Sequence, residues 1–234
     1  MRVRVGTSGF SYPAWKGSFY PAELPSGRML SFYAERFPAV EVNNTFYRMP
    51  SAKTLAGWRA EVTEGFRFAL KAPQRITHQR RLADCAEPVA FLYRAAAELG
   101  ATLGPVLFQL PPNMKKDLPR LAAFLEILPP GGRSAFEFRH TTWFADDVYE
   151  TLRARNAALC VAESEDLEVP VVATADFGYL RLRKADYGGP DLTAWAERIL
   201  AQPWTEAFAF FKHEEEGKGP RLAAALSALV EARP

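Results

Sequence analysis

The chain has 234 residues, of which 48% are hydrophobic and 13% aromatic, so it can build a sizeable core. With 29 Lys and Arg against 27 Asp and Glu, the net charge of +2 speaks against a disordered polyelectrolyte and against a nucleic-acid binder that acts through overall charge. The start, MRVRVGTSGFSY, lacks a secretion-type apolar segment and no run of about 18 apolar residues follows, so we expect a cytoplasmic protein outside the membrane.

Short β-type runs alternate with helical patterns along the chain. The expected strands cover residues 2–6, 39–43, 66–71, 105–110, 134–139, 157–162, 178–183 and 207–212. Apolar residues at three- and four-residue spacing predict helices over residues 31–37, 51–62, 88–100, 117–128, 145–156, 192–201 and 220–232. Ser51 is the expected N-cap of the second of these helices. Strands that alternate with helices indicate a parallel sheet.

The link between the sixth and seventh expected strands departs from this pattern. It reads SEDLEVPVVATAD, with a proline and β-branched pairs, so we expect an irregular or missing helix there. Eight strand and helix repeats without a linker favour one closed barrel over a doubly wound sheet. We therefore predict an α/β protein, a (β/α)8 TIM barrel, in a single domain over residues 1–234.

Charged and amide side chains interrupt strands that should be apolar. In a barrel, alternate residues of a strand face the interior, and the large apolar residues must face the helices. In the run AFEFR, for example, Phe136 and Phe138 face outward while Glu137 and Arg139 face inward. Applied to each strand, this parity gathers polar residues at the C-terminal mouth, where barrel active sites form. The set is Glu41, Asn43, Lys71, Gln109, Glu137, Arg139, Arg181 and Arg183.

A purely structural ion-pair network is the alternative explanation of this cluster. Buried ion pairs stabilise a fold poorly, however, because the desolvation of each charge costs several kcal/mol. We therefore interpret the cluster as a functional cavity, and assign Arg4 and Arg67, which lie near the strand starts, to structural pairs. Cys85 and Cys160 are too few for a disulfide framework and are expected to pack in the core.

The sequence resembles the YecE-like family, TIM-barrel proteins that are also described as domain of unknown function seventy-two. The matching stretches are GTSGFSYPAWKGSFYP (6–21), VEVNNTFYRMP (40–50), FRFALKAP (66–73), LFQLPP (107–112), EFRHTTW (137–143) and YLRLR (179–183). The resemblance implies the barrel fold but no settled activity. Two positions depart from the family pattern: Arg183 and Lys184 stand where His-Gly is frequent, and Lys212 and His213 where Asn-Asn is frequent. Both changes make the mouth more basic, which favours an anionic substrate.

Acid-base catalysis is the chemistry that this mouth favours. The expected proton carriers are Glu41 and Glu137, with one glutamate kept neutral by a dry pocket while the other stays ionised. Lys71 is the third candidate catalytic residue. The substrate would be small and either anionic, that is phosphorylated or carboxylated, or sugar-like. The residues expected to bind it are Asn43, Tyr47, Gln109, Arg139, His140, Trp143, Arg181, Arg183, Lys212 and His213. The glycines of YGGPDL (187–192) offer amides to an anion before a helix.

Other functions remain open at this level. Lys71 could form a Schiff base with a carbonyl substrate if its pKa is lowered. We consider this mechanism less favoured than acid-base catalysis. A metal-dependent hydrolase or isomerase could use Glu41, Glu137, Glu163 and His213, but no metal-binding spacing occurs, so we expect neither metal nor cofactor. A non-catalytic metabolite- or nucleic-acid-binding module is the further alternative, and nucleic acid is not favoured because the basic runs at 78–82 and 115–120 are short. The sequence does not predict the oligomeric state.

Overall fold

Eight parallel strands close into one barrel. A computed structural model describes residues 1–163 and 167–232, and in it each strand pairs with the next one along the chain while β8 pairs with β1. The strands are β1 (Arg2–Ser8), β2 (Ala39–Val42), β3 (Arg67–Lys71), β4 (Leu103–Gln109), β5 (Ser134–Glu137), β6 (Ala158–Glu163), β7 (Phe177–Leu182) and β8 (Glu206–Phe211). The predicted TIM-barrel fold and all eight predicted strands are confirmed.

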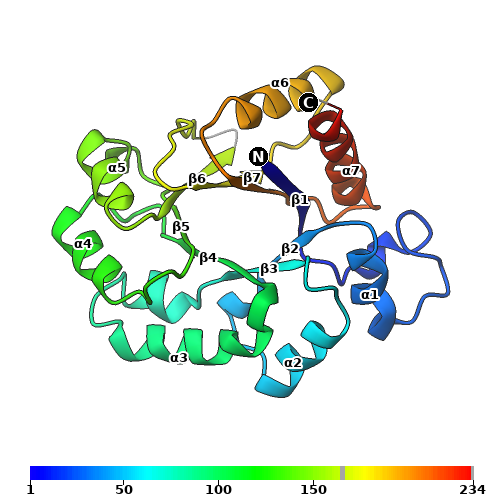
Figure 1. Cartoon of the computed structure of the whole chain (residues 1–234), viewed down its shortest axis with the longest axis horizontal. Coiled ribbons are helices and arrows are strands. Elements are labelled where there is room, and N and C mark those ends of the chain that lie inside the picture. The colour runs from blue at the N-terminus through cyan, green and yellow to red at the C-terminus, as the bar shows by residue number, and fades with distance from the viewer. Residues whose placement is uncertain (164–166, 233–234) are drawn as a thin grey trace.

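Helices form the outer layer of the barrel (Figure 1). They are α1 (Met29–Ala34), α2 (Ala52–Ala60), α3 (Ala86–Ala96), α4 (Leu118–Glu126), α5 (Asp146–Arg153), α6 (Gly189–Leu200) and α7 (Lys218–Glu231). Ser51 caps α2 as predicted, because its hydroxyl accepts a hydrogen bond from the Thr54 amide at 3.1 Å. Asp117 caps α4 in the same way through the Arg120 amide at 3.1 Å.

The connection from β6 to β7 differs from the other crossovers. Residues 167–176 contain no helix and lead directly into β7. Residues 164–166 lie outside the described residues, so the predicted absence of a helix stays a prediction for the link as a whole.

Side-chain parity divides the core into two layers, as the alternation predicts. Phe68, Phe108 and Phe136 are fully buried between the strands and the helices. The barrel interior is filled by small and aromatic side chains, namely Ala39, Ala69, Leu107, Ala135, Ala158, Cys160, Ala162, Phe177, Tyr179, Phe208 and Phe210. The interior is therefore packed below the mouth and is not a pore.

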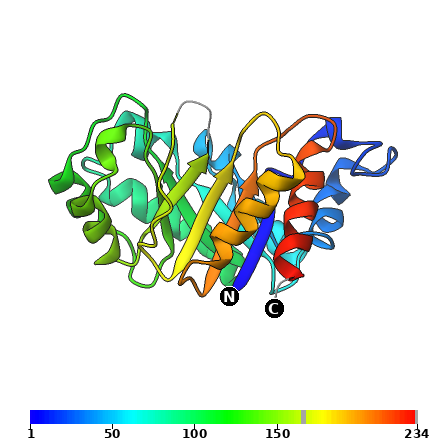
Figure 2. The same cartoon turned by 90° about the horizontal axis from the view of Figure 1, so that it is seen from above.

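The two ends of the barrel have different charge patterns. At the strand starts, Glu206 accepts ion pairs from Arg4 and Arg133, so Arg4 is part of a structural pair as predicted. Figure 2 shows all strands running in one direction, with the two chain ends on the face of the strand starts. The C-terminal ends of the strands meet at the opposite face. No helix among the described residues is long and apolar enough to cross a membrane.

Candidate functional site

A buried arginine joins two buried glutamates at the mouth. Arg181, on β7, donates from Nε and Nη2 to Glu41 Oε1 at 3.1 and 2.9 Å, and from Nη1 to Glu137 Oε2 at 2.6 Å. Both glutamates have no exposed surface and Arg181 is 2% exposed. Because Glu41 lies on β2 and Glu137 on β5, Arg181 bridges strands across the barrel. Three residues that the alternation along the strands placed at the mouth are thus in direct contact.

Further donors saturate the two carboxylates. Ser8 and Tyr179 each donate to Glu41 at 2.7 Å. Gln109 donates from Nε2 to Glu137 Oε1 at 2.8 Å, and Arg139 donates from Nε to the same oxygen at 2.9 Å. Asn43 accepts a long contact of 3.4 Å from Arg181. A carboxylate that accepts several hydrogen bonds is held both in position and in its ionised form.

Ser8 and Tyr179 are site residues that sequence reasoning missed. Tyr179 shares the inward parity of Arg181, so the alternation along β7 was a sufficient signal for it. Ser8 was missed because the first strand was predicted to end at residue 6, whereas β1 continues to Ser8.

The pKa values of both glutamates lie below the ordinary value. Burial alone would raise them, but the Arg181 guanidinium and the hydrogen bonds from Ser8 and Tyr179 lower the pKa of Glu41. For Glu137, Arg181, Arg139 and Arg183 outweigh the burial and lower the pKa strongly. The prediction that one glutamate is kept neutral by a dry pocket is therefore wrong, because positive charges compensate both.

Lys71 is a group at the mouth whose pKa is moved toward neutral pH. Burial, with a smaller contribution from Arg181, lowers its pKa to about 8. The Lys71 ammonium lies over the face of the Phe46 ring, 4.1 Å from its centre, and the edge of His78 meets the same ring. The Lys71 carbonyl accepts a hydrogen bond from Thr45 at 2.6 Å, which ties the end of β3 to the loop after β2.

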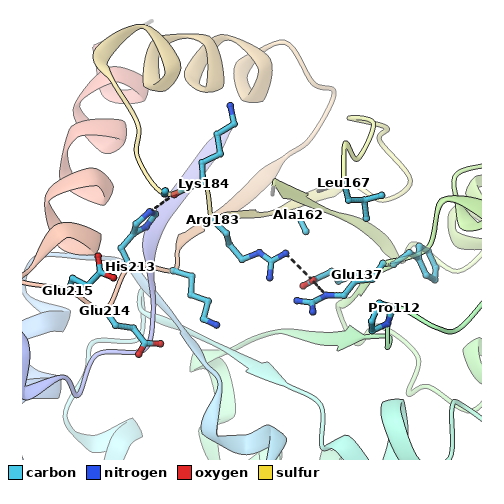
Figure 3. A pocket seen from close by; sticks show the side chains of 13 residues that line it. Pro112, Glu137, Ala162, Leu167, Arg183, Lys184, His213, Glu214 and Glu215 are labelled. Atoms are coloured by element: carbon cyan, nitrogen blue, oxygen red, sulfur yellow. Dashed lines mark hydrogen bonds and ion pairs between the residues drawn. The ribbon is translucent and has the colours of Figure 1, made fainter. Parts of the chain in front are cut away.

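A cavity of about 770 Å³ opens above Glu137, on the side of β5 to β8. Figure 3 shows Arg183 extending toward Glu137, while Glu214 and Glu215 lie across the opening from it. The residues that line the cavity are Pro112, Glu137, Phe138, Arg139, Ala162, Leu167, Arg183, Lys184, Ala185, Lys212, His213, Glu214 and Glu215. Of the predicted binding residues, Arg139, Arg183, Lys212 and His213 thus reach this cavity.

The cations of the cavity wall are incompletely paired. Arg183 has one ion-pair contact, 3.8 Å from Glu137, and its buried Nε has no hydrogen-bond partner within residues 1–163 and 167–232. Lys212 is exposed and its ammonium makes no ion pair or hydrogen bond with the described part of the chain. Glu137 is already bound by Arg181 and Arg139. Among the described residues, the lining has four cations, Arg139, Arg183, Lys184 and Lys212, and three carboxylates, Glu137, Glu214 and Glu215, so the wall carries a small excess of positive charge.

Asn43, Gln109 and Arg181 belong to the buried network and do not line the cavity, and three further predicted binding residues lie outside both. Trp143 is fully buried, stacks on Phe138 and donates from Nε1 to the Met114 carbonyl at 2.7 Å, so its predicted contact with substrate is wrong. Tyr47 is 75% exposed and does not line the cavity. His140 caps the turn after β5, where its Nδ1 bonds to Thr142, and it also lies away from the lining.

The backbone amide that the glycine turn before α6 could offer to an anion is already bonded to a side chain of the protein. The Asp191 carboxylate accepts a hydrogen bond from the Gly188 amide at 2.8 Å, so a carboxylate already lies at this helix start. Glu163 accepts hydrogen bonds from Tyr187 and Trp195 and pairs with Lys184 at 2.9 Å. Within the described residues, no group of three or more His, Cys, Asp or Glu side chains is arranged to hold a metal ion.

Nearly the whole chain matches a known family of proteins. The family model described as protein of unknown function DUF72 matches residues 4–234. The UPF0759 protein YecE of Escherichia coli K12 is 31% identical over 144 residues, which are 61% of this chain and 50% of YecE. The chain thus spans about half the length of the curated relatives that it matches.

Solved structures resemble the chain along its entire length. A DUF72 family protein of Thermotoga maritima has a TM-score of 0.83 at 25% identity, with 99% of this chain and 100% of that chain covered. A xylose isomerase domain protein of Alicyclobacillus acidocaldarius has a TM-score of 0.56 at 16% identity, with 98% of each chain covered. The second likeness is one of fold alone.

Proposed function

Because this chain belongs to the DUF72 family, which is described as a family of unknown function, we propose from its own geometry that the mouth catalyses proton transfer on a small anionic substrate. The observation that carries the proposal is that Arg183 and Lys212 line the cavity beside the buried Glu41–Arg181–Glu137 bridge, Arg183 with one long ion pair and Lys212 with none among the described residues. Arg139, which pairs with Glu137 at 2.9 Å, adds a further guanidinium to the lining. Buried charges that converge under a cavity are typical of functional sites.

The anion-binding part of the proposal rests on Arg139, Arg183 and Lys212. All three line the cavity of about 770 Å³, and Lys212 has no partner within the described residues. A guanidinium forms paired hydrogen bonds with a carboxylate or a phosphate, and an ammonium adds a point charge. The expected substrate therefore carries a carboxylate or a phosphate group.

Lys71 is the proposed proton carrier. Its pKa of about 8 lets it exchange a proton near neutral pH, whereas the lowered pKa values of Glu41 and Glu137 make these carboxylates weak bases. The two glutamates instead fix Arg181 in the floor of the mouth. Lys71 does not line the cavity, so the substrate would have to extend beyond the cations of the cavity wall to reach it.

Exchange of carbon-bound protons in D2O tests this proposal. Small carboxylates and phosphate esters are incubated with the protein and followed by proton NMR, and signal loss reports proton transfer. Lys71→Met should abolish exchange, while Lys53→Met, on the exposed face of α2, should keep it. Binding of anions without exchange for any compound would instead support a non-catalytic binding module.

A further inference from the structure

Two buried polar atoms without partners lie in the wall of the same cavity. Within residues 1–163 and 167–232, the buried side-chain nitrogens and oxygens that lack a hydrogen bond are Arg183 Nε, Trp204 Nε1 and His213 Nδ1. Arg183 and His213 both line the cavity of about 770 Å³. Buried polar groups in native proteins are nearly always hydrogen-bonded, so two such atoms in one cavity wall point to a missing partner.

One of the two atoms needs a hydrogen-bond acceptor and the other needs a donor. Arg183 Nε is a donor that needs an acceptor. His213 Nε2 lies 2.7 Å from the Lys184 carbonyl oxygen, which can only accept, so Nε2 must carry the ring hydrogen (Figure 3). In the neutral ring, Nδ1 is then an acceptor that needs a donor. Burial lowers the pKa of His213 and keeps the ring neutral at neutral pH.

His213 is held rigidly in this orientation. It is 7% exposed, and the rings of Tyr187 and Phe211 pack against it at 5.9 and 6.2 Å between centres. Tyr187 is itself fixed by its hydrogen bond to Glu163 at 2.6 Å. A ring that is fixed by packing and by one hydrogen bond can discriminate a ligand that offers a hydrogen-bond donor from one that does not.

We propose that the cavity binds a hydroxylated anion: Arg183 and Lys212 hold the carboxylate or phosphate, and His213 Nδ1 accepts a hydrogen bond from a hydroxyl of the same molecule. This inference rests on the proposed anionic substrate and adds the hydroxyl. The discrimination should be large, because an analogue without the hydroxyl leaves Nδ1 buried and unpaired.

Calorimetric titration with three probes of equal carbon number tests the inference. D-gluconate carries a carboxylate and hydroxyls, hexanoate lacks the hydroxyls, and sorbitol lacks the carboxylate. We expect D-gluconate to bind roughly tenfold or more tightly than either of the others, the effect of one satisfied hydrogen bond or charge contact. Similar affinities for D-gluconate and hexanoate would overturn hydroxyl recognition and leave the anion site standing. No binding of either anion, or equal binding of sorbitol, would overturn the anion site as well.

Variants assign the hydroxyl contact to His213. His213→Phe should weaken D-gluconate roughly tenfold, to the level of hexanoate, and leave hexanoate unchanged. His213→Asn, which keeps an acceptor near Nδ1, should restore part of the loss. Arg183→Leu should weaken both anions, whereas Arg155→Leu should weaken neither, because Arg155 lies just after α5 in an exposed pair with Glu126, away from the cavity. Equal loss of both anions in His213→Phe, with its melting temperature intact, would contradict the assignment.

Discussion

Arg181 donates two hydrogen bonds to one carboxylate oxygen of Glu41, from Nε at 3.1 Å and from Nη2 at 2.9 Å. Arg181 is 2% exposed and Glu41 has no exposed surface, and the third nitrogen of Arg181, Nη1, donates a hydrogen bond to Glu137. Removal of Arg181 would leave the two negatively charged carboxylates buried without their shared positive partner. Such a loss is far more costly than the loss of a surface ion pair.

We therefore expect Arg181→Met to lower the free energy of unfolding at pH 7 by about 3–5 kcal/mol. Urea denaturation measures the loss. The matched control is Arg155→Met, whose exposed pair with Glu126 should be worth about 0.5 kcal/mol or less. Equal stability of the two variants would show that Glu41 and Glu137 are not ionised in the folded protein.

The two glutamates should make the protein sensitive to acid. Their folded-state pKa values lie below the ordinary value, so their contribution is present above about pH 4.5 and is lost as the pH falls. Glu137→Gln should therefore destabilise the protein at pH 7, and the gap to the wild type should narrow below about pH 4. Urea titrations at several pH values measure the gap. A gap that stays constant with pH would contradict a lowered pKa for Glu137.

Lys71 should titrate near pH 8 and oppose folding while it is charged. Because its folded-state pKa lies below that of the unfolded chain, the cost is present below about pH 8 and disappears as the pH rises toward about 10.4. NMR of 15N-labelled lysine, assigned with Lys71→Met, measures the midpoint. A midpoint near 10.4, the ordinary value for a lysine, would remove Lys71 as proton carrier.

Two glycines should respond in opposite ways to alanine. A Cβ at Gly6, on β1, would overlap the Ala39 carbonyl of β2 and lie 2.9 Å from the Tyr33 hydroxyl, so Gly6→Ala should destabilise the barrel by several kcal/mol. A Cβ at Gly57, inside α2, meets nothing within 4 Å, so Gly57→Ala should stabilise by about 0.5–1 kcal/mol. Thermal unfolding compares the two. A neutral Gly6→Ala would mean that β1 and β2 can separate there.

The barrel and the floor of its mouth could be predicted from the sequence because both follow from strand parity. Glu41, Glu137 and Arg181 lie at inward positions of three strands, and a closed barrel leaves inward side chains only one space to share. The pKa directions could not be predicted, since they depend on whether burial or neighbouring charge prevails. Distances decide that balance, and a sequence does not supply them.

The loop aromatics were harder to predict. Trp143 follows β5 in a short turn, and nothing in its spacing distinguishes a ring that faces a cavity from one that stacks on Phe138. The incomplete pairing of Arg183 and His213 was equally hidden, because it depends on which atoms the neighbouring loops leave without partners.

The start of β1 at Arg2 and the end of α7 at Glu231 lie on the face opposite the cavity (Figure 2). A tether at either end, such as an affinity tag, a fluorescent fusion or a sensor chip, would thus hold the molecule by its base. Immobilised in this way, the protein would present the cavity at its mouth to the flowing solution, which suits it to surface-based screening of the proposed anionic ligands.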